Sequence, residues 1–207
     1  MTSALNATSA TADPPATGVG EVDTYEEKAL GFWLYLMSDA IIFALLFATY
    51  VVMAPNHAGG STGKDVFSLG RAFAETMLLL CSSITFGFAT VAVRLRNQQV
   101  VLTWLAVTFV LGAAFIALEI GELTGMYQQG AGPQRSGFLS AFFTLVGTHG
   151  LHVSMGLVWI LILSLQVLVK GLSPPVTSRL FRLGLFWHFL DIVWIGIFSI
   201  VYLPGVL

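Results

Sequence analysis

Eight acidic or histidine side chains lie within long apolar stretches of this sequence, where an ionisable group needs an explanation. They are Asp39, Glu75, Glu119, Glu122, His149, His152, His188 and Asp191. Six of them form three pairs spaced i, i+3, namely Glu119 with Glu122, His149 with His152, and His188 with Asp191. In a helix the two members of such a pair project from one face and so point at a neighbouring helix. Because an ionisable group is costly to bury in hydrocarbon, each of the eight is a candidate for a functional or structural role.

Carboxylates and imidazoles at these positions allow three kinds of chemistry. A carboxylate paired with an imidazole locks two helices together, and a count of depth along the helices predicts Asp191 and His152 as such a pair. The histidines could also ligate Fe, Cu or Zn, and a proton relay could run past Asp39. Three intramembrane histidines on two helices are too few for the ligands of a full redox enzyme, so we assign no catalytic residue and no metal ligand to this chain.

Membrane-spanning helices must position these side chains. The 207 residues are 56% hydrophobic and 10% charged, with a mean hydropathy of +0.84, whereas a soluble domain carries about 25% charged residues. Five apolar segments each reach the roughly 20 residues that cross the hydrocarbon core. We therefore predict an all-α, polytopic membrane bundle of five transmembrane helices, with spans at 29–54, 72–93, 100–120, 137–169 and 180–203.

The charges of the chain set its expected domain organisation and orientation. Residues 1–28 are rich in Ala, Thr, Ser, Pro and Gly, which predicts a disordered tail before a transmembrane domain at 29–207. Six of the nine cations lie in the tail and in the second and fourth breaks, which predicts the N-terminus inside and the C-terminus outside. A net charge of −2 with no basic face excludes a nucleic-acid partner.

Five segments of the sequence, in order and in spacing, resemble subunit III of the haem–copper oxidases. The segments are GFWLYLMSD at 31–39, ETMLLLCSS at 75–83, EIGE at 119–122, GTHGLHV at 147–153 and FWHFLDIVW at 186–194. The five-span form and the short tail are most similar to subunit III of the bacterial cytochrome o ubiquinol oxidases. The resemblance implies that Asp39 stands where many members carry a carbodiimide-reactive glutamate.

The resemblance implies a non-catalytic accessory subunit of a proton-pumping ubiquinol oxidase in the bacterial inner (plasma) membrane. Such a subunit binds no cofactor itself; the haem and copper belong to subunit I. Its partners would be subunits I, II and IV together with phospholipid, and it would support assembly, stability and proton supply in aerobic respiration. Two alternatives stay open on the sequence, namely subunit III of a cytochrome c oxidase and an independent small membrane transporter.

Overall fold

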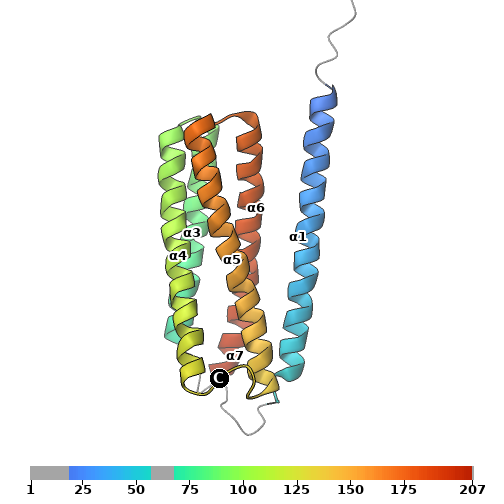
Figure 1. Cartoon of the computed structure of the whole chain (residues 1–207), viewed down its shortest axis with the longest axis vertical. Helices are drawn as coiled ribbons and strands as arrows, with labels where there is room; N and C mark the ends of the chain where they lie inside the picture. The colour runs from blue at the N-terminus through green and yellow to red at the C-terminus, as the bar shows by residue number, and fades with distance from the viewer. Residues whose placement is uncertain (1–18, 57–67, 207) are drawn as a thin grey trace, which may run out of the picture.

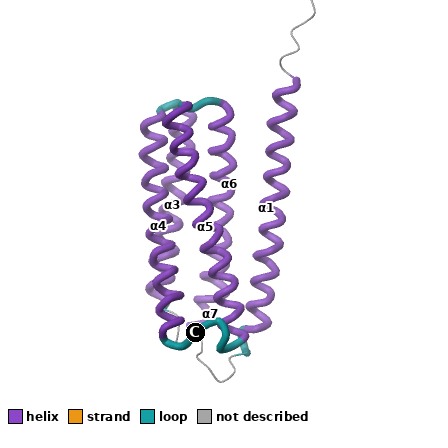
Figure 2. Tube along the Cα trace, in the orientation of Figure 1, coloured by secondary structure: helices purple, strands orange, loops and turns teal. Residues whose placement is uncertain are grey.

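The computed structural model describes the backbone of residues 19–56 and 68–206, and the side chains of 29–56 and 68–204. Within these ranges the chain is helical and has no strand (Figure 1, Figure 2). The elements are α1 (Val19–Met53), α3 (Leu69–Arg94), α4 (Gln98–Gln128), α5 (Gly137–Lys170), α6 (Pro174–Ile197), the π-helix η1 (Phe198–Tyr202) and α7 (Leu203–Val206).

Five of the described helices are long and apolar enough to cross a membrane, which confirms the predicted all-α bundle of five spans. The ends of two spans differ from the prediction. Helix α4 continues to Gln128 because Glu122 and Met126 are buried against the rest of the bundle. Helix α6 begins at Pro174, a position where proline is tolerated because the first amides of a helix have no partner within it.

The start of the first helix also differs from expectation. Helix α1 begins at Val19, so the predicted boundary at Lys28 between tail and first span falls inside one continuous helix. The apolar, membrane-spanning part of this helix runs from Ala29 to Met53. The remainder of the predicted tail, residues 1–18, lies outside the described residues.

Helices α3, α4, α5 and α6 form a closed ring, because each packs on the next and α6 packs back on α3. Helix α1 lies outside this ring and contacts α5 and α6 (Figure 1). The connections from α3 to α4, from α4 to α5 and from α5 to α6 are short, so these consecutive helices run antiparallel. Residues near the end of one helix therefore lie level with residues near the start of the next.

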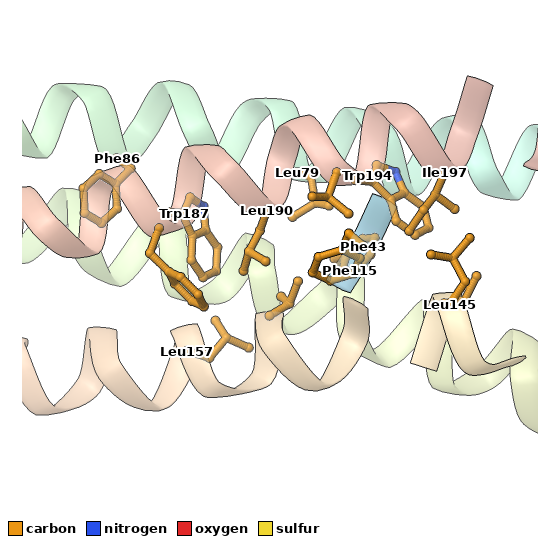
Figure 3. Close-up of a cluster of buried hydrophobic side chains, with 14 of the residues drawn as sticks. Phe43, Leu79, Phe86, Phe115, Leu145, Leu157, Trp187, Leu190, Trp194 and Ile197 are labelled. Carbon is orange, nitrogen blue, oxygen red and sulfur yellow. The ribbon is translucent and has the colours of Figure 1, made fainter. Parts of the chain in front are cut away.

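Two tryptophans of α6 fill the centre of the ring (Figure 3). Trp187 and Trp194 are 2% and 0% exposed. A Cβ added at Gly112 of α4 or at Gly156 of α5 would lie 2.9 Å from the Trp187 ring, so the large side chain of one helix packs into the space left by glycine on two others. Close packing of this kind fixes the rotation of each helix about its axis and so the direction of its polar groups.

Candidate functional site

The structure divides the eight predicted residues among four places. Glu75, Glu119 and Glu122 form a buried carboxyl cluster between α3 and α4. Asp39 and His152 meet between α1 and α5. The remaining polar residues are His149, which is enclosed by aromatic rings, and His188 and Asp191, which lie on α6 beside Ser83 of α3.

The carboxyl cluster lies at the end of the bundle where α3 begins and α4 ends. Glu75, Glu119 and Glu122 are 0%, 3% and 5% exposed and lie close enough to interact electrostatically. Among the described residues, neither oxygen of Glu75 or Glu119 has a hydrogen-bond partner. Glu119 packs directly on α5, because a Cβ at Gly150 would come within 2.6 Å of its Oε1. Such a cluster can hold protons or water between the helices.

Two residues that the sequence interpretation did not include complete this cluster. The hydroxyl of Tyr202 donates a hydrogen bond of 3.4 Å to Oε2 of Glu122. Tyr202 is the last residue of the π-helix η1 and is 1% exposed, although its place near a span end predicts an aromatic facing the membrane interface. Arg71, an exposed residue of the first turn of α3, interacts electrostatically with Glu75 and Glu122 from the edge of the cluster.

The pair between α1 and α5 corrects one prediction. Nε2 of His152 lies 3.8 Å from Oδ2 of Asp39, and its Nδ1 bonds the carbonyl of Thr148 at 2.8 Å. Nδ1 is hydrogen-bonded and Nε2 faces Asp39 beyond hydrogen-bond distance, so the carboxylate beside His152 is that of Asp39 and the predicted pairing of Asp191 with His152 is wrong. A count along each helix gives depth, but the rotation of α6 turns Asp191 toward Ser83 of α3 instead.

His149 is 0% exposed, and neither of its ring nitrogens has a partner among the described residues. Its ring lies 5.3 Å from that of Trp194 at 30° and meets Phe115 edge-on at 5.9 Å. Phe43 of α1 approaches it at 6.3 Å. In this structure His149 is packed as an aromatic ring between three helices, not placed as a link to the carboxyl cluster.

Hydroxyl groups of α3 and ring nitrogens of α6 form a hydrogen-bonded seam. Trp187 donates to Ser82 Oγ at 3.0 Å and Trp194 donates to Thr76 Oγ1 at 3.0 Å. His188 Nδ1 bonds the Ser83 hydroxyl at 2.9 Å. The hydroxyl groups of this seam are not among the residues predicted from the sequence. A pattern that could have indicated them is present in the sequence, because Thr76 and Ser82, about two turns apart on one span, face Trp194 and Trp187, seven residues apart on another.

Comparison with known proteins then identifies the family. The family described as cytochrome c oxidase subunit III matches residues 16–206. The chain belongs to this family. It is 55% identical over 185 residues to cytochrome bo(3) ubiquinol oxidase subunit 3 of Pseudomonas putida (89% of each chain), and 51% identical over 185 residues to that of Pseudomonas aeruginosa (89% and 88%). It is 41% identical over 180 residues to cytochrome c oxidase subunit 3 of Bacillus sp. strain PS3 (87% of each).

Membership confirms the predicted resemblance and favours an accessory oxidase subunit over an independent transporter. As a subunit III, the chain is a multi-pass membrane protein that associates with other oxidase subunits. Among its described residues, no group of three or more His, Cys, Asp or Glu side chains is arranged to hold a metal ion.

Proposed function

We propose that this subunit III stabilises the catalytic subunit of a proton-pumping quinol oxidase in a bacterial inner membrane during aerobic respiration. The observation that carries the proposal is the placement of the polar residues. Five of the eight predicted residues, Asp39, Glu122, His152, His188 and Asp191, contact polar groups on other residues of the chain, Glu75 and Glu119 complete the buried carboxyl cluster, and His149 is packed between aromatic rings. Polar contacts between helices stabilise a membrane bundle, and among the described residues no group of these side chains is arranged to hold a metal.

The partners in this proposal are subunits I, II and IV, and phospholipid fills the remaining surface. Subunit I carries the haem and copper and reduces oxygen. Ubiquinol is the favoured electron donor, because the two Pseudomonas relatives named for it are 55% and 51% identical to this chain, against 41% for the relative named for cytochrome c. Donor choice is a property of the partner subunits, so the experiment below measures it on the whole complex.

The positions of the cations support an inside N-terminus. Arg94 ends α3, Lys170 ends α5, and Arg179 and Arg182 lie in the first turns of α6, so these cations share one end of the bundle. Cations concentrate on the cytoplasmic side of membrane proteins. The carboxyl cluster lies at the opposite end, which faces outward in this orientation. Asp39, near the middle of its span and beside His152, is then the residue best placed to assist proton supply.

Purification of a tagged form of this chain tests the proposal. Expressed in its own host and extracted in mild detergent, the tagged chain should co-purify with partner subunits that show a haem absorption spectrum. The purified complex should consume oxygen with a reduced ubiquinone analogue and not with reduced cytochrome c. A chain that purifies alone, without haem, would contradict the accessory role; activity with cytochrome c alone would contradict the choice of donor.

A further inference from the structure

A histidine is exposed at the middle of the last span. His188 lies fourteen residues from each end of the span Pro174–Tyr202, about 21 Å along the helix from either end. It is exposed, whereas Asp191, one turn further along α6, is buried. An exposed polar ring at this depth faces the centre of the hydrocarbon core, where polar side chains are rare and costly unless paired.

The ring of His188 is held in one orientation. Its Nδ1 bonds the hydroxyl of Ser83 on α3 at 2.9 Å, and the ring meets Phe86 nearly edge-on at 6.1 Å and 80°. Asp191 interacts with Ser83 and His188 from the next turn. Among the described residues Nε2 has no partner, and it lies on the side of the ring away from the Ser83 hydroxyl. The second ring nitrogen is thus presented outward at a fixed position.

The surface around His188 has the pattern of a helix-packing seam. Phe181, Leu185, Ile192 and Ile195 are 42%, 41%, 68% and 44% exposed. With His188 they recur at intervals of four, three, four and three residues, which is the repeat by which one helix packs along another in a left-handed pair. An apolar stripe alone would suit lipid acyl chains as well as a packed helix. The polar His188 ring at its centre favours a helix, because a side chain of that helix can hydrogen-bond it.

We infer that this stripe of α6 is covered in the assembled oxidase by a transmembrane helix of another oxidase subunit, which offers a hydrogen-bonding side chain to Nε2 of His188. The inference rests on the proposed function only in that it requires an oxidase complex. Phospholipid is the weaker occupant, because acyl chains carry no polar group at mid-membrane. Headgroups belong at the end of the stripe, where a hollow of about 770 Å³ is lined by Arg94, Arg96 and Arg182.

Photo-crosslinking in the assembled complex tests the occupant. Benzoylphenylalanine is placed at Ile192, and at Val110 of α4, which is 64% exposed and serves as a matched control. Illumination of membranes followed by purification and mass spectrometry should give an Ile192 adduct on a transmembrane peptide of another oxidase subunit, and that peptide should not be captured from Val110. An Ile192 adduct on lipid, on a second copy of this chain, or on the same peptide as Val110 would overturn the inference.

Substitution of His188 tests the hydrogen bond. His188→Leu should lower the fraction of this chain that remains with the detergent-purified complex about fivefold or more, and His188→Gln, whose amide can hydrogen-bond, should restore most of it. Because His188 is exposed, both variants should keep the wild-type helical circular dichroism. Equal retention of His188→Leu and wild type would overturn the pairing. If the chain co-purifies with haem but these results fail, the inference falls and the proposed function stands.

Discussion

The ring of α3 to α6 and the outer helix α1 are built on different principles. In the most apolar stretches of α3, α4, α5, and α6 with η1, 44%, 28%, 33% and 50% of the residues are buried within the chain, against 22% in α1. Helix α6 is joined to α3 by three side-chain hydrogen bonds, whereas α1 is joined to α5 by aromatic contacts and the 3.8 Å contact of Asp39 with His152. The ring helices are therefore held mainly by contacts with one another, whereas α1 depends more on contacts with lipid or partner subunits outside the chain.

This difference predicts which substitutions affect the fold and which affect docking. Changes inside the ring remove packing that nothing else replaces, so they should lower the stability of the whole chain. Changes at the contact between α1 and α5 remove a weak polar link from a helix that also contacts its surroundings. They should loosen α1 and shorten the working life of the complex, with little effect on its initial rate.

Trp194→Ala should have the largest effect. The indole is 0% exposed, meets Phe115 edge-on at 4.7 Å and donates to Thr76, so its removal leaves a large cavity and breaks a hydrogen bond between α6 and α3. The expected loss of stability is about 3–5 kcal/mol. Thermal denaturation of the purified chain, followed by size-exclusion recovery, measures it. Trp194→Phe is the control and should lose clearly less; equal losses would show that packing in the ring is not what matters.

Gly184→Ala should come next. Its new Cβ would lie 2.8 Å from Cε1 of Phe86, a ring that is itself 0% exposed and cannot move away. Overpacking of this kind costs about 1–3 kcal/mol. Gly87→Ala, on the neighbouring α3, meets no atom within 4 Å and should leave the melting temperature within error of wild type. A similar loss in both variants would mean that any glycine in these helices is sensitive, and the ring argument would fail.

Asp39→Asn should have the smallest effect on stability. An interhelical polar contact in a membrane is worth about 0.6–1 kcal/mol, and a double-mutant cycle with His152→Gln should return a coupling of that size. Oxygen consumption by the variant complex should begin near the wild-type rate and decline faster over repeated turnovers. Complete inactivity of an intact variant complex would place Asp39 in the catalytic path and break the distinction between ring and outer helix.

The sequence was sufficient to predict where the spans lie and which polar residues they contain, but not the direction in which each side chain points. Hydropathy locates a helix to within a few residues, and a rise per residue gives depth, so Asp39 and His152 are correctly placed near the middle of their spans. Rotation about the helix axis depends on packing such as that of Trp187 on Gly112 and Gly156. That rotation is why the pairing of Asp191 with His152 is wrong.

The same limit explains the composition of the carboxyl cluster. The i, i+3 spacing of Glu119 and Glu122 predicts that both face a neighbouring helix, and they do. Tyr202 could not be added from its position, because its approach to Glu122 follows from the π-helical turn that ends the last span. Neither periodicity nor composition distinguishes that turn from an ordinary α-helical one.

Depletion of this chain from the oxidase tests the central claim, that it stabilises the complex and does not take part in its redox chemistry. Complexes purified with and without the chain would be compared by haem spectrum, by copper content and by oxygen consumption over many turnovers. The account predicts equal haem and copper per catalytic subunit and a similar initial rate, followed by earlier inactivation of the depleted complex. Loss of a haem or copper signal, or of the initial rate, from an otherwise assembled complex would contradict it.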